Sequence, residues 1–194
     1  MRRGRRFPGR PLRRPIRGLA NRRPVPLKLR EANQLYAAGE YEKAAGLYDE
    51  IAQRAEQNDL PQAANLYLRA AISFLKYGEL PKTKTLLQKC FQYCIDKKRW
   101  PQLQRVLKVA STELDASGQA DLKSELYDWL HAQLSGTDQK ILETTDTAGE
   151  PSHKAMVLPA HCPNCGGPIQ LNEVEWYDSE NPICAFCGSI LRDG

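Results

Sequence analysis

Apolar side chains recur every three or four positions between residues 28 and 134, which is the spacing of helices with one buried face. Three prolines 20 residues apart each precede such a segment, and three glycines 39 and 40 residues apart each follow one: Pro61, Pro81 and Pro101, and Gly39, Gly78 and Gly118. Proline suits the first position of a helix, and glycine suits its C-terminal stop. The pattern therefore predicts six helices, near residues 28–38, 41–56, 61–77, 80–96, 100–116 and 119–134.

The predicted helices are related by an internal repeat. Relative to each of the three glycines, a small residue stands seven positions before, and apolar or aromatic residues stand four before, nine after and twelve after. The aligned sets are Ala32, Ala71 and Ser111; Leu35, Phe74 and Leu114; Tyr48, Leu87 and Tyr127; and Ile51, Cys90 and Leu130. A small residue lets the two helices of a pair approach closely, while the other positions fill the space between pairs. A fixed period of this kind indicates stacked helix pairs, of which about three are needed for stability.

The first unit, ANQLYAAGEYEKAAGLYDEIAQ (residues 32–53), resembles a tetratricopeptide repeat, in its Gly39–x–Tyr41 turn, Ala44 and Tyr48. The second and third units keep the small residue and the glycine but lack the tyrosine after it. The resemblance covers residues 28–134 and implies a mainly α fold of three antiparallel helix-hairpin repeats. The period of 39 to 40 residues is longer than the family's usual 34, so a helical-hairpin array or a six-helix bundle without true repeat geometry stays open.

Such arrays bind protein or peptide segments along an extended concave surface rather than catalyse reactions. By analogy with the family, first-helix positions would line this groove. In this chain they are Asn33, Tyr36, Leu68, Ile72, Arg105, Lys108 and Thr112. The resemblance therefore implies a polypeptide partner for these residues.

Four of the six cysteines stand in two pairs with the spacing C-x2-C-x18-C-x2-C: Cys162, Cys165, Cys184 and Cys187. This spacing is typical of zinc sites. Gly166 and Gly188 directly follow the pairs, where a sharp turn can direct both thiols of a pair at one ion. Four thiolates form a closed tetrahedron without a position for substrate, so we expect one structural Zn²⁺.

The motifs CPNCG and CAFCG resemble those of a zinc ribbon, which implies a small β module with strands near residues 168–176 and 189–193. Iron suits the same four thiolates, and His161 stands beside the first cysteine, where we expect it to be a bystander. Disulfides conflict with the reducing cytosol expected for this chain, and a thioredoxin-type site needs a βαβ context that is absent. Cys90 and Cys94 stand one helical turn apart, and we expect both in the core.

Charge, composition and motifs together divide the chain into four parts. Residues 1–30 contain twelve Lys or Arg and no Asp or Glu, so the remaining residues carry a net charge of −7. The composition predicts a disordered Arg/Pro-rich arm (1–27), the helical repeats (28–134), a flexible linker (135–156) and the zinc ribbon (157–194). Residues 157–194 contain five acids and only one base, so a nucleic acid or other polyanion would bind through residues 1–26 instead.

These features favour a non-catalytic adaptor, with the repeats and the ribbon as two contact surfaces. The ribbon is expected to act as a docking knob or as a lid over the last helix pair. A nucleic-acid-associated factor tethered through the arm is the first alternative, and a thiol redox or metal-handling protein is the second. No apolar run reaches the length of a transmembrane helix or follows the basic start, so we expect a cytoplasmic protein.

Overall fold

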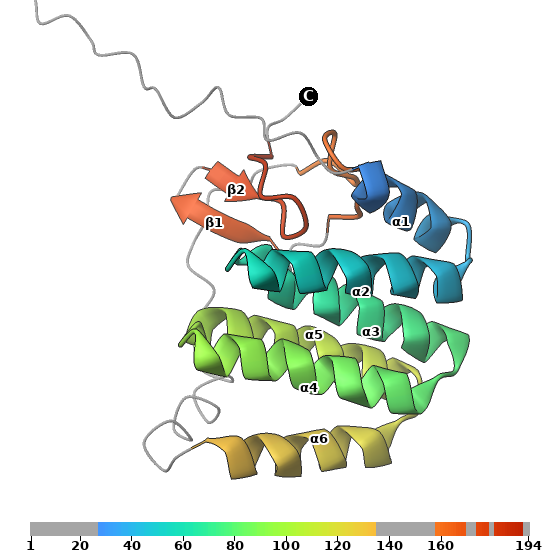
Figure 1. Ribbon diagram of the computed structural model, residues 1–194, viewed down its shortest axis with the longest axis vertical. Coiled ribbons are helices and arrows are strands. Elements are labelled where there is room, and N and C mark those ends of the chain that lie inside the picture. The colour runs from blue at the N-terminus through green and yellow to red at the C-terminus, as the bar shows by residue number, and fades with distance from the viewer. Residues whose placement is uncertain (1–26, 135–157, 170–173, 179–180, 192–194) are drawn as a thin grey trace, which may run out of the picture.

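The computed structural model describes residues 27–134, 158–169, 174–178 and 181–191 (Figure 1). The predicted basic arm, apart from Leu27, and the predicted linker lie outside the described residues, and both stay predictions. Within the described part, six helices form one array, and two short strands belong to a small C-terminal module. We use "C-terminal module" for the described residues from 158 to 191.

The six helices match the sequence pattern closely. They are α1 (Leu27–Ala37), α2 (Tyr41–Gln57), α3 (Gln62–Tyr77), α4 (Leu80–Asp96), α5 (Trp100–Ala116) and α6 (Ala120–Gln133). Every predicted boundary falls within one residue of the observed one. Successive helices run back and forth through short turns, so the mainly helical prediction is confirmed (Figure 1).

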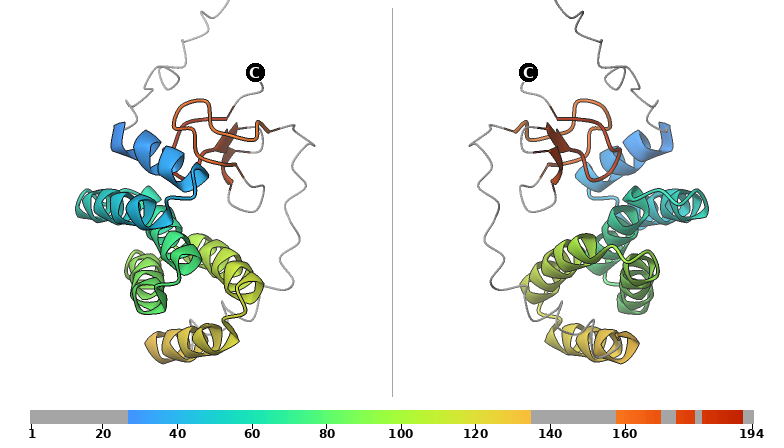
Figure 2. Two further views of the ribbon diagram at one scale, coloured as in Figure 1. Left: turned by 90° about the vertical axis from the view of Figure 1, so that its right-hand side faces the viewer. Right: turned by 90° about the vertical axis from the view of Figure 1, so that its left-hand side faces the viewer.

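The helices are arranged in two layers. Helix α2 packs between α1 and α3, and α4 packs between α3 and α5, while α6 lies against α4 and α5 at one end. Figure 2 shows α1, α3 and α5 on the side of the C-terminal module, with α2 and α4 on the opposite side. Three of the small residues at helix crossings, Ala32, Ala44 and Ala71, are 0% exposed, as expected where backbones approach closely. The array therefore has its own apolar core.

Left-handed residues follow the first five helices, because this backbone conformation allows the last carbonyl groups to be satisfied. The three predicted glycines, Gly39, Gly78 and Gly118, have φ of 78°, 96° and 67°. The turns after α2 and α4 use Asp59 and Lys98 instead, with φ of 54° and 52°. The sequence pattern missed these two positions, since neither residue type is a helix-stop signal.

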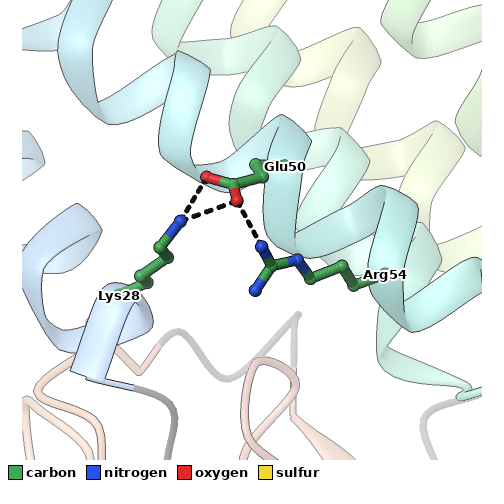
Figure 3. Close-up of polar contacts among 3 residues, drawn as sticks. All are labelled: Lys28, Glu50 and Arg54. Carbon is green, nitrogen blue, oxygen red and sulfur yellow. Dashed lines mark hydrogen bonds and ion pairs between the residues drawn. The ribbon is translucent and has the colours of Figure 1, made fainter.

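The first helix is joined to the second by an ion-pair cluster (Figure 3). The Lys28 ammonium donates hydrogen bonds of 2.6 and 2.7 Å to the two carboxylate oxygens of Glu50 on α2. One turn further along α2, Arg54 donates to the same carboxylate at 2.7 Å. The hydrogen bond from Lys28 holds the pKa of Glu50 below its usual value. This cluster links the start of the array to its second helix.

The strands differ from the prediction. Strand β1 (Glu175–Asp178) pairs antiparallel with β2 (Asn181–Ile183), and a register irregularity separates Trp176 from Asp178. The predicted first strand thus overlaps the observed one only at its end, and residues 170–173 lie outside the described part. Residues 189–193 were expected to return as a strand, but their described part contributes only one isolated bridge, between Ile190 and Ile183. The second strand of the observed hairpin ends at Ile183, before the predicted strand begins, because residues 184–188 form a turn.

None of the helices in the described part of the chain combines the length and the apolar character required to cross a bilayer.

Candidate metal centre

Two turns of the same geometry hold the four cysteines. In the first knuckle (residues 162–167), the Gly166 amide donates to the Cys162 carbonyl at 2.8 Å. In the second knuckle (residues 184–189), the Gly188 amide donates to the Cys184 carbonyl at 2.9 Å. Both glycines are left-handed, with φ of 73° and 69°, which an L-residue adopts only at a cost. Each turn therefore directs both of its thiols to the same side.

The four sulfur atoms converge on one point. Their Sγ atoms all lie within 4.8 Å of one another. Between the two knuckles, Cys162 lies 3.7 Å from Cys187, and Cys165 lies 3.8 Å from Cys184. A zinc–sulfur distance of about 2.3 Å gives a tetrahedron with edges of about 3.8 Å, so these separations fit an ion coordinated by all four thiolates. All four cysteines are free, and a disulfide would need sulfurs about 2.05 Å apart.

Neighbouring donors favour negative charge on the sulfurs. The Ser189 hydroxyl lies 2.9 Å from the Cys187 sulfur and 3.4 Å from the Cys162 sulfur. The Gly167 amide donates to the Cys165 sulfur at 3.4 Å. Hydrogen bonds to metal-bound thiolates are the usual means by which a protein orients and stabilises its ligands. Ser189 and Gly167 extend the site beyond the residues predicted from the cysteine spacing.

The four thiols strongly influence one another's protonation. The pKa of Cys162 lies well below its usual value because the thiols of Cys165, Cys184 and Cys187 can donate to its sulfur. The pKa values of Cys165 and Cys184 lie well above the usual value, first because each shares a proton with Cys162. Without a cation the cluster thus holds some of its protons. A divalent ion would replace these protons and offset two of the four negative charges, which leaves the site with a net charge of about −2.

The other candidate ligands lie elsewhere. His161 is exposed and is not part of the four-sulfur cluster. Cys90 and Cys94 are 0% exposed in the helical core, where the Cys90 thiol donates to the Ala64 carbonyl at 3.2 Å. Burial raises the pKa of Cys90, which favours the neutral thiol. Among the described residues, the four clustered cysteines make up the one group of three or more that could hold a metal ion.

Both knuckles rest on the helices through their backbones. On α1, the Asn33 amide donates to the Cys165 carbonyl at 2.8 Å, and its oxygen accepts from the Tyr48 hydroxyl at 2.7 Å. On α3, the Asn65 amide donates to the Ala185 carbonyl at 3.0 Å. Arg30 adds a hydrogen bond of 3.0 Å from its Nε to the Asn164 carbonyl. These donors fix the C-terminal module to the array by contacts that do not depend on its side chains.

An aromatic side chain completes this contact. The guanidinium of Arg69, itself 2% exposed, lies 4.9 Å from the ring centre of Phe186 and 5.2 Å from that of Tyr36. Beside it, a narrow pocket separates the second knuckle from α3 and α5. Its lining consists of Asn65, Leu68, Arg69, Arg105, Val106, Val109, Ala185 and Phe186. The Phe186 ring thus covers apolar side chains of two helices.

We call the surface of α1, α3 and α5 that faces the module the inner face. It includes Asn33, Asn65, Leu68, Arg69 and Arg105. The module lies on this face at the end of the array opposite α6, so the expected lid over the last helix pair is wrong in its position (Figures 1 and 2). Near Phe186 the second knuckle shares a pocket with Arg105, Val106 and Val109 of α5, the first helix of that pair.

The residues of the predicted partner groove are distributed along the same side of the array. Asn33, Leu68 and Arg105 lie against the module, and Tyr36 lies beside Arg69. Ile72 is buried, whereas Lys108 and Thr112 are exposed on α5.

Sequence reasoning missed Asn65 and Phe186, because a lone amide and a lone aromatic ring carry no signal without their partners.

The comparisons with known proteins add no relative to this picture: no protein-family model, no curated protein and no solved structure matches the chain.

Proposed function

We propose that the chain is a non-catalytic protein-interaction adaptor, in which three tetratricopeptide-like repeats bind a polypeptide segment and one zinc ion shapes a C-terminal zinc ribbon. One observation carries the proposal. The inner face holds a polypeptide segment of its own chain by side-chain amides that donate to backbone carbonyls, from Asn33 to Cys165 and from Asn65 to Ala185. Donors to main-chain groups provide affinity for peptides, and adjoining pockets provide selectivity.

The part of α5 beyond the module is the surface proposed for a partner. Lys108 and Thr112 are exposed there, one turn apart, and Arg105 lines the adjoining pocket. Two basic side chains within one turn favour an acidic segment, since complementary charge selects partners and speeds association. The proposed partner is therefore an acidic peptide segment that runs along α5.

The adaptor proposal is tested by capture of interacting proteins with the full chain, in parallel with two charge-reversal variants. Lys108→Glu lies on the proposed surface, and Lys43→Glu, an exposed residue of α2 in the other layer, is the matched control. We expect Lys108→Glu to reduce capture of a specific partner about tenfold or more and Lys43→Glu to leave it unchanged. Equal capture by wild type and both variants would contradict the proposal.

The proposed zinc is tested by elemental analysis of the purified chain. We expect one zinc ion per chain, loss of this zinc in Cys184→Ser, and full retention in the core control Cys94→Ala. Iron in place of zinc would change the metal and leave the four-thiolate assignment intact. A chain that is free of metal yet keeps residues 158–191 folded would contradict the structural-zinc part of the proposal.

The nucleic-acid alternative depends on residues 1–26, which lie outside the described part. Its support is the run of basic side chains in the sequence. It predicts that RNA or DNA binding disappears when residues 1–26 are deleted and that affinity falls steeply with salt. The redox alternative predicts reversible oxidation of the ribbon cysteines, with metal release, under mild oxidant. A zinc-loaded cluster that stays reduced under the same oxidant would oppose it.

A further inference from the structure

We propose that the C-terminal module is a metal-held plug of the inner face, and that loss of its metal frees this face for a peptide that presents a backbone carbonyl followed by an aromatic side chain. This inference rests on the proposed function, and it names both the regulation of the binding surface and the chemistry of one ligand. The first step of the argument is what the inner face recognises, and the second is how the metal controls it.

The chemistry recognised by the inner face is visible in the second knuckle. The Ala185 carbonyl accepts from Asn65, and the next residue, Phe186, places its ring 4.9 Å from the Arg69 guanidinium. The same ring lines the pocket with Leu68 and Val109. A carbonyl and an adjacent aromatic ring together satisfy a polar donor, a cation and an apolar surface. A peptide with this pair of groups can therefore replace the knuckle.

The metal ligands fix the positions of the groups through which both knuckles contact the inner face. Ala185 and Phe186 lie between Cys184 and Cys187, so two coordinated sulfurs fix their position. In the first knuckle the docked carbonyl belongs to a ligand, Cys165, itself. A segment of this size has too small an apolar core to stay folded without its metal. Removal of the ion therefore unfolds both knuckles and separates their docking groups at the same time.

The inner face has groups that need a partner once the module leaves. Asn33 and Asn65 are 5% and 6% exposed in the docked state, and Leu68 is 4% exposed. Release of the module would expose the two amides and the apolar surface beside them. We expect the array beneath to stay folded, because most of its buried side chains, among them Cys90 and Cys94, are enclosed by the helices themselves. The opened state is thus a folded array with an uncovered binding surface.

The experiment measures thiol accessibility in the full-length Leu68→Cys chain. N-ethylmaleimide labelling is located by peptide mass spectrometry, first in the zinc-loaded chain and then after treatment with a chelator. We expect the labelling rate at position 68 to rise at least about tenfold when the metal leaves, as expected for a local opening. The ribbon cysteines report metal release in the same sample. Cys90 and Cys94 serve as the internal control and should stay unlabelled.

A second variant separates docking from metal binding. Adding Asn65→Ala and Phe186→Ala to Leu68→Cys removes the docking groups of the second knuckle but leaves all four ligands. We expect this chain to retain its zinc and yet label at position 68 without chelator. If position 68 stays protected after the metal leaves, the plug is disproved. If Cys90 and Cys94 become labelled together with position 68, the array and the module unfold as one unit, and the plug is likewise disproved.

The ligand chemistry is tested with a fluorescent peptide that carries residues 183–188 with serine in place of both cysteines. Anisotropy is measured against the metal-free Phe186→Ala chain, which cannot use its own ring. We expect saturable binding that is lost when the peptide's phenylalanine is replaced by alanine. A dissociation constant weaker than about 1 mM would overturn the ligand assignment. None of these outcomes depends on Lys108 or on zinc identity, so failure of the plug is distinguishable from failure of the adaptor proposal.

Discussion

At the scale of single residues, the fold depends on left-handed backbone at defined positions. Three helices end at a glycine, where this conformation costs little, whereas α2 and α4 end next to Asp59 and Lys98. Asp59 has a further role, because its carboxylate forms an ion pair with the Lys97 ammonium at 2.8 Å. Lys98 is exposed, so its substitution isolates the backbone effect.

We expect Lys98→Gly to raise the free energy of unfolding by up to about 1 kcal/mol, since the left-handed conformation costs a non-glycine residue roughly that amount. The greater freedom of glycine in the unfolded chain offsets part of the gain. Urea denaturation of the zinc-loaded chain measures the difference. Gly78→Ala, at φ of 96°, is the reciprocal control and should lower stability by about 1 kcal/mol. A neutral or destabilising Lys98→Gly would contradict this interpretation.

At Gly167 the first knuckle lies close both to the second knuckle and to the array. A Cβ atom there would lie 2.9 Å from the Phe186 ring and 3.3 Å from the Asn33 amide. We therefore expect Gly167→Ala to displace Phe186 and destabilise the docked module by about 1–3 kcal/mol, as overpacking does. Hydrogen exchange in the module measures this loss. Gly46→Ala, with open space around it in α2, should instead stabilise its helix.

At the scale of elements, α1 is held on two sides. Its Lys28 pairs with Glu50 of α2, and its Asn33 bonds to both Tyr48 and Cys165. The first contact is electrostatic and partly exposed, while the second is a buried hydrogen-bond chain. The two contacts should therefore respond differently to pH.

The contribution of Glu50 depends on pH in one direction. Its pKa is lowered in the folded state by the hydrogen bond from Lys28, so this stabilisation is present above the unfolded pKa and is lost as the pH falls through the folded one. We expect Glu50→Gln to lower the melting temperature slightly at pH 7, and the difference from wild type to vanish in the acidic range. Glu31→Gln, an exposed carboxylate of α1, is the control. A difference that persists in acid would contradict the ion-pair explanation.

At the scale of the whole molecule, the array and the C-terminal module depend on each other unequally. The helices supply most of the buried apolar side chains of the core that the two parts share, whereas the module needs its four sulfurs brought together. Asn33, Asn65 and Arg69 are buried beside the docked module, so we expect metal binding to stabilise the inner face as well. Linked stabilisation of this kind depends on the concentration of free ligand.

We expect the melting temperature of the full chain to rise with free zinc, because the ion binds only the folded module. Chelation should lower it while most of the helical circular dichroism at 25 °C remains. Scanning calorimetry over a zinc series measures the effect. Cys162→Ser should show no dependence on zinc, and a wild-type melting temperature that is equally insensitive would contradict the linkage.

Local sequence accounts for most of the secondary structure and for the candidate metal ligands. Helix period, proline and glycine act within a few residues, so the boundaries of the six helices were predictable to within one residue. The two CxxC pairs identify the candidate ligands, because each turn is a local structure. The β-strands were less predictable, since the position of the hairpin depends on the residue at which the second knuckle begins.

The contact between the two parts was decided only by the tertiary structure. The hydrogen bonds from Arg30, Asn33 and Asn65 to the knuckles join residues that are 134, 132 and 120 positions apart. Their acceptors are backbone carbonyls, which every residue carries, so no side-chain pattern identifies them. Burial of a donor and an acceptor from distant segments depends on how the array curves and where the module folds. Neither property is encoded within any single stretch of the chain.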